Sequence, residues 1–72
     1  MSEETKHDRF KRLSEARINK TLKNIGLLEN LANTNNYHYT REDYERIIAS
    51  LRDAVDDLEA AFKKREKGNF KW

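Results

Sequence analysis

Apolar residues in the second half of the chain recur at steps of three and four positions. Such spacing lines them up along one face of an α-helix, because a helix turns once in about 3.6 residues. The stripe consists of Tyr44, Ile47, Ile48, Leu51, Ala54, Val55, Leu58, Ala61 and Phe62. The opposite face carries Arg46, Asp53, Asp56 and Asp57. The pattern predicts an amphipathic helix from residue 41 to about residue 67.

Both ends of this second helix match helix-capping chemistry. Thr40 and Asp43 have the spacing of a capping box, in which each side chain accepts a hydrogen bond from the other residue's backbone N–H. Tyr39 and Tyr44 fall at the two positions of a hydrophobic staple. At the other end, lysines and an arginine precede Gly68, which suits a left-handed C-cap.

The first half of the chain is also amphipathic, but its apolar residues fall on two faces. The main stripe consists of Phe10, Ile18, Leu22, Ile25, Leu28 and Ala32. The second face consists of Leu13, Ala16, Leu27 and Leu31. One neighbouring helix needs only one stripe, so the second face predicts a second neighbour and is the candidate oligomer interface.

The predicted first helix runs from about residue 5 to residue 32. Ser2 or Thr5 can cap its start, and Thr5 is followed by Asp8 at the capping-box spacing. Gly26 lies inside the pattern at a cost of about 1 kcal/mol relative to alanine. It either permits close approach of another helix or breaks off a third short helix. The single helix is the favoured interpretation.

The segment from Asn33 to Tyr39 connects the two helices. Its length is within the usual helix–helix range of about 2–8 residues. Its asparagines bond to nearby backbone groups and tolerate left-handed conformations, whereas His38 has no evident role in a turn. The prediction is therefore an all-α antiparallel two-helix hairpin, a single domain over 1–72 with flexible ends at 1–4 and 68–72. Two hairpins paired through the second face would make a four-helix bundle.

The size and composition of the chain favour self-association. A domain of 72 residues, 36% hydrophobic and 39% charged, lies near the limit below which one core stabilises a chain alone. The chain has no cysteine, so neither disulfides nor a thiolate zinc site add stability. Oligomerisation is the remaining way for so small a domain to gain stability. With no long apolar run and no signal peptide, the expected location is the cytoplasm, away from membranes.

The sequence contains no residue pattern that indicates a catalytic or metal-binding site. In a hairpin, His7 and His38 lie at opposite ends, so no histidine pair binds a metal or assists Ser14 or Ser50. The acidic residues 53–59 fit a solvated helix face better than a metal site. No glycine-rich phosphate loop is present, and the helices are too long for a helix-turn-helix. We expect a non-enzymatic protein without cofactor, metal or small-molecule substrate.

The distribution of charge gives a second functional hypothesis. Net charge is only +2, but basic residues gather at the start of the first helix and after residue 62. A hairpin brings these segments together, and cations beside aromatic rings suit phosphates and bases. Basic residues at a helix end also simply favour the helix dipole and solubility. The candidate nucleic-acid surface consists of Lys6, Arg9, Lys11, Arg12, Lys63, Lys64, Arg65, Lys67, Lys71 and Trp72.

The run RINKTLKNIGLLENLANTNNYHYTREDYERI, residues 17–47, resembles a set of short bacterial proteins often carried near mobile elements. Their pattern is an R-[IV]-N-x-x-L helix, an asparagine-rich bend and Y-x-Y-T before a second helix. The resemblance implies a structural bend and an interaction or regulatory role, and it assigns no functional residue. The two-helix layout is also similar to Rop-type plasmid copy-number regulators, which are dimeric four-helix bundles that bind RNA. That second likeness concerns architecture alone.

These observations favour a helical interaction or regulatory protein that self-associates and binds another protein. The alternative is a small RNA- or DNA-binding regulator that uses the basic segments. The two hypotheses differ in salt dependence, because phosphate contacts weaken steeply as salt rises.

Overall fold

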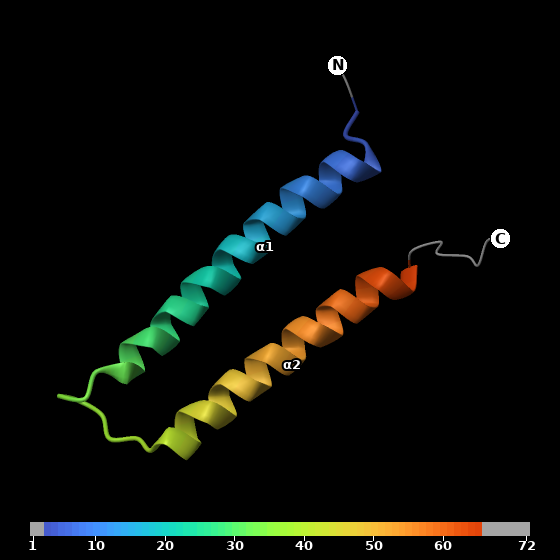
Figure 1. Ribbon diagram of the computed structural model, residues 1–72. Helices are drawn as coiled ribbons and strands as arrows, with labels where there is room; N and C mark the ends of the chain where they lie inside the picture. The colour runs from blue at the N-terminus through green and yellow to red at the C-terminus, as the bar shows by residue number, and fades with distance from the viewer. Residues whose placement is uncertain (1–2, 66–72) are drawn as a thin grey trace. The chain divides into compact units, whose positions relative to one another are not determined.

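The computed structural model describes residues 3–65, which form two α-helices and a short connection (Figure 1). Helix α1 spans Lys6–Glu29, a 3-10 turn η1 spans Asn30–Ala32, and helix α2 spans Arg41–Arg65. No strand occurs within these residues. The predicted all-α class and both predicted helices are confirmed.

Helix α1 starts with a complete capping box. The backbone N–H of Asp8 donates to Oγ1 of Thr5 at 3.0 Å, and the N–H of Thr5 donates to Oδ2 of Asp8 at 3.3 Å. Two backbone donors that would lack a partner inside the helix are thereby satisfied. Thr5 is therefore the N-cap of α1. The alternative cap, Ser2, lies outside the described residues.

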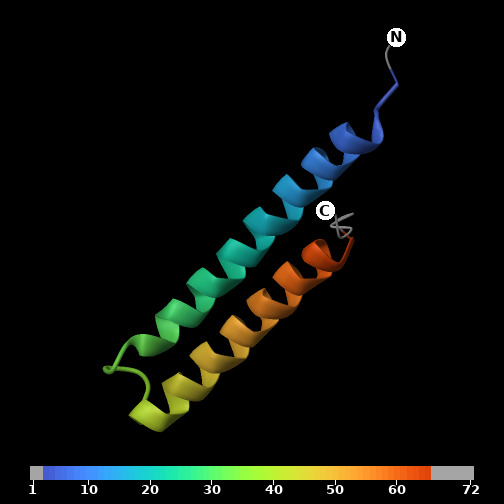
Figure 2. The ribbon, with the colours of Figure 1, turned by 45° about the vertical axis from the view of Figure 1, so that its right-hand side comes forward.

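Helix α1 continues through Gly26 without a break, and Figure 2 shows it as one continuous ribbon. A Cβ added at Gly26 would meet nothing within 4 Å. The predicted single helix is confirmed, although its last turn tightens into η1. There the N–H of Asn33 donates to the carbonyl of Asn30 at 3.3 Å, a three-residue step.

The asparagines of the connection form a local turn. Backbone N–H groups of Asn36 and Tyr37 both donate to the carbonyl of Asn33, at 3.2 and 3.0 Å. The Asn33 side chain accepts from the N–H of Asn35 at 2.9 Å. Side-chain bonding to nearby backbone is thus the role of Asn33, whereas Asn35 and Asn36 contribute backbone N–H groups. A left-handed conformation is not needed, since no described residue has positive φ.

Helix α2 starts as its sequence predicts. The N–H of Asp43 donates to Oγ1 of Thr40 at 3.1 Å, and the N–H of Thr40 donates to Oδ2 of Asp43 at 2.8 Å. The rings of Tyr39 and Tyr44 meet edge to face, with centroids 6.2 Å apart and planes at 83°. This contact is the predicted staple and fixes the direction of entry into α2. The predicted end near Lys67 and the Gly68 cap lie outside the described residues.

The chain divides into two units, Met1–His38 and Tyr39–Trp72. None of the residues 3–65 is buried. The apolar stripe of α2 is largely exposed, by 42–61% at Ile47, Ile48, Val55, Leu58 and Phe62. The single domain, the antiparallel pairing of the helices and the four-helix bundle remain predictions.

Candidate interaction surfaces

The apolar face of α2 is one candidate interaction surface among the described residues. It includes an open groove of about 490 Å³, lined by Ile48, Leu51, Val55 and the charged Arg52 and Asp56. Leu51 is half-buried, whereas Val55 is 61% exposed. Large apolar side chains aligned over several turns of a surface helix mark a contact with another helix or protein.

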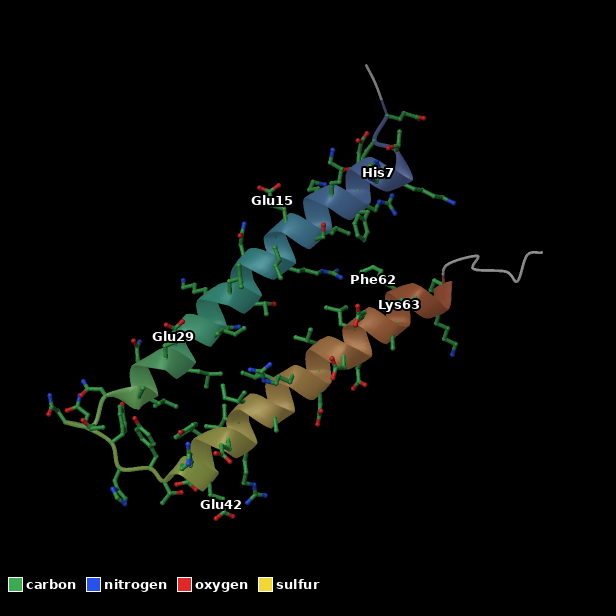
Figure 3. The ribbon with its side chains drawn as sticks, in the orientation of Figure 1. His7, Glu15, Glu29, Glu42, Phe62 and Lys63 are labelled. Atoms are coloured by element: carbon green, nitrogen blue, oxygen red, sulfur yellow. The ribbon has the colours of Figure 1, made fainter. Side chains whose placement is uncertain are left out.

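Ion pairs within α2 run beside this apolar face. Arg41 Nε lies 3.2 Å from Glu45 Oε1, and Lys63 Nζ lies 3.4 Å from Glu59 Oε2. Figure 3 shows Lys63 in the last turns of α2. All four side chains are more than half exposed, so each pair contributes about 0.3–0.5 kcal/mol at most.

The second apolar face of α1 is interrupted. Leu13 is half-buried, while Ala16 and Leu27 are exposed. Lys20 lies seven residues from both Leu13 and Leu27, and this spacing puts all three on one side of the helix. Leu31 is 42% exposed and falls in η1, where the tighter turn changes its direction relative to α1. The predicted interface is therefore two short patches separated by a lysine.

The basic residues at the start of α1 are partly neutralised by Glu4. Nε and Nη2 of Arg12 donate to the two Glu4 carboxylate oxygens at 2.8 and 3.1 Å, and Arg9 Nε lies 3.9 Å from the same carboxylate. The hydrogen bond from Arg12 lowers the pKa of Glu4, and the same bond raises the pKa of Arg12. Within the described residues, Lys6 and Lys11 form no ion pair.

Sequence reasoning did not find Glu4. It lies eight residues before Arg12, outside the three- and four-residue spacings that predict ion pairs on a helix. The pair forms because Glu4 precedes the cap residue Thr5, in extended chain that folds back over the first turns. The only available signal was an acidic residue just before an N-cap.

The basic residues of α2 fall in its last turn. Lys63, Lys64 and Arg65 lie there, where cations favour the negative end of the helix dipole. Lys63 is paired with Glu59, and within residues 3–65 neither Lys64 nor Arg65 forms an ion pair. The remaining members, Lys67, Lys71 and Trp72, lie outside the described residues. Convergence of these cations with those of α1 remains a prediction.

Among residues 3–65, no group of three or more His, Asp or Glu side chains is placed to hold a metal ion. His7 lies exposed in the first turn of α1 (Figure 3), and His38 is exposed at the end of the connection. Neither helix, over its described length, is long and apolar enough to cross a membrane.

Comparisons with protein-family models, with curated proteins and with solved structures found no significant match. The fold class and the candidate surfaces therefore rest on this chain's own residues. They define a two-helix all-α chain whose apolar faces are uncovered within each of its units.

Proposed function

We propose that the protein is a non-enzymatic helical interaction protein that self-associates and binds another protein in the cytoplasm. The observation that carries the proposal is that neither helix has a buried residue within its own unit, although both helices are amphipathic. The resemblance of residues 17–47 to proteins carried near mobile elements supports a regulatory role.

The energetics support association. Burying one large apolar side chain contributes roughly 1.5–3 kcal/mol, and an isolated helix is only marginally stable in water. Helices of 24 and 25 residues with exposed stripes therefore gain most of their stability from contact with other helices. A binding function and a folding requirement are met by the same surface.

The arrangement we propose is an antiparallel hairpin that pairs with a second copy as a four-helix bundle. The turn centred on the Asn33 carbonyl and the immediate start of α2 after Thr40 support chain reversal. The second copy would contact Leu13, Ala16, Leu27 and Leu31. Lys20 fits such an interface if its aliphatic stem packs against the leucines and its ammonium group reaches the rim.

One variant tests self-association directly. Leu27→Asp places a charge on the second face and should lower the mass measured by light scattering to that of one chain. Asn19→Asp adds the same charge to α1 away from that face and should leave the mass unchanged. Equal masses for the two variants would remove the interface from the proposal.

A nucleic-acid ligand is the second candidate function. Lys6, Lys11, Lys64 and Arg65 support it, because they form no ion pair within residues 3–65. Glu4 opposes it, since its carboxylate occupies Arg12 and lies near Arg9. The chain's net charge of +2 also provides little long-range attraction. Protein binding is therefore the primary proposal.

A further inference from the structure

One edge of the apolar face of α2 is a continuous row of apolar side chains. The row consists of Ile47, Leu51, Ala54, Leu58 and Ala61, which recur at steps of three and four residues. Ile47 and Leu58 in this row are 42% and 55% exposed. All of its positions lie inside the α2 range, and none of them is polar. Two such helices can therefore pack along the row without burying a polar side chain in it.

Charged residues of alternating sign flank this row. In chain order they are Asp43, Arg46, Asp57 and Lys64. They lie on the same side of the row, because Asp43, Asp57 and Lys64 are separated by multiples of seven residues and Arg46 follows Asp43 by three. All four residues are exposed, and Arg46, Asp57 and Lys64 form no ion pair within residues 3–65.

We propose that α2 packs antiparallel against α2 of a second copy along this row, about a two-fold axis near residue 53. The order of charges is negative, positive, negative, positive, and it has the opposite signs when it is reversed. Asp43 then faces Lys64 of the second copy, and Arg46 reaches Asp57 of the second copy. A parallel pair would instead place each charge beside its own copy, which is unfavourable. The proposal rests on the self-association of the proposed function and names a surface at which it occurs.

The same axis aligns the apolar row with its copy. Ile47 faces Leu58 of the second copy and Leu51 faces its Ala54, because the members of each pair are equally spaced about the same midpoint. Residue 53 is also the centre of Arg41–Arg65, so the two described helices overlap over their whole length.

Charges select this register among those that the seven-residue repeat allows. A shift by one repeat in one direction would bring Asp43 opposite Asp57 of the second copy. A shift by one repeat in the other direction would bring Asp57 opposite its own copy. Both alternatives place two carboxylates together, whereas the proposed register pairs each carboxylate with a cation.

The other edge of the apolar face stays uncovered in this pair. It carries Ile48, Val55 and Phe62, which are exposed in the single chain. Each helix of a four-helix bundle contacts more than one neighbour. This second edge is therefore available for a further helix of the proposed bundle.

Thiol crosslinking of the full chain tests the pairing, because the chain has no natural cysteine. Ala54→Cys places the thiols of two copies beside the axis, so a short bis-maleimide should link them into a covalent dimer. Ala61→Cys is the matched control in the same row, where the two positions are about 24 Å apart along the helices and should not be linked. Equal linking of the two variants, as a parallel pair would give, or linking of Ala61→Cys alone, overturns the proposal.

Light scattering of the same samples before crosslinking separates this proposal from the proposed function. A dimeric mass without linking of Ala54→Cys overturns the pairing of α2 and leaves self-association in place. A mass of one chain without linking overturns both.

Charge exchange gives a second measurement of the same contact. Arg46 and Asp57 are 11 residues apart, about 16 Å along α2, so they do not contact each other within one helix. Arg46→Glu and Asp57→Arg should each raise the dimer dissociation constant. The double variant should have a constant about 2- to 10-fold below the value that the singles combined predict. The control combines Arg46→Glu with Asp56→Arg, on another side of α2. No coupling at Asp57, or equal coupling at Asp56, overturns the proposal.

Discussion

Arg12 forms a bidentate ion pair with Glu4, in which Nε and Nη2 each donate a hydrogen bond to one carboxylate oxygen. The pair ties the segment before the N-cap to the second turn of α1. The ion pair also involves Arg12, a residue of the candidate nucleic-acid surface predicted from the sequence. Binding of a phosphate by Arg12, which stays a prediction, would compete with this ion pair.

The Glu4 pair predicts a pH dependence at this end of α1. The Arg12 hydrogen bond depresses the folded-state pKa of Glu4. Its stabilisation is therefore fully present above the unfolded pKa and is lost as pH falls through the lower folded value. An NMR titration should place the Glu4 midpoint below the ordinary glutamate value. Arg12→Gln should return it toward that value, and Arg9→Gln should have a smaller effect. A midpoint unaffected by Arg12→Gln would exclude the pair in solution.

Truncation of the capping residue Thr40 should measurably lower the free energy of unfolding. Thr40→Ala removes the oxygen that accepts from the Asp43 N–H and should lower the free energy of unfolding by about 1 kcal/mol. Thr40→Ser keeps the hydroxyl and should cost much less. Urea denaturation followed by circular dichroism compares the variants. Equal stability of Thr40→Ala and the parent chain would show that the cap does not contribute.

Replacing Gly26 by alanine should stabilise the folded chain rather than destabilise it. A methyl group there meets nothing within 4 Å, so Gly26→Ala should raise the free energy of unfolding by about 1 kcal/mol through helix propensity alone. Thermal unfolding measures the change. A destabilised variant would show that another helix approaches α1 closely at this position, which is the alternative explanation for the glycine.

Substitutions at the basic end of α2 distinguish nucleic-acid binding from protein binding. If nucleic acid is the ligand, changing Lys63, Lys64 and Arg65 together to alanine should reduce RNA retention at low salt and flatten its salt dependence. Changing Arg41, Arg46 and Arg52 to alanine removes the same charge elsewhere on α2 and serves as the control. Equal retention by both triple variants would exclude a specific basic surface.

Local sequence signals predicted much of the helix structure because they act over a few residues. The pairs Thr5–Asp8 and Thr40–Asp43 form capping boxes as their spacing requires, and Tyr39 meets Tyr44. The short range of capping contacts makes them independent of tertiary packing.

Other features depend on geometry beyond a helical repeat. The Glu4 pair involves extended chain before a cap, and the 3-10 turn at Leu31 alters a face that a regular α-helix would have continued. Pairing of the two helices depends on side chains far apart in sequence, so it remains a prediction. Lys20, seven residues from both Leu13 and Leu27, interrupts the second face, and this spacing can be seen in the sequence alone.

The dependence of thermal stability on protein concentration tests most directly whether association covers the apolar faces. Binding between copies stabilises the folded state by mass action. Circular dichroism should therefore give a Tm that rises steadily between roughly 1 and 100 μM chain. A cooperative transition with the same Tm across that range would show that the isolated chain folds alone and would contradict self-association.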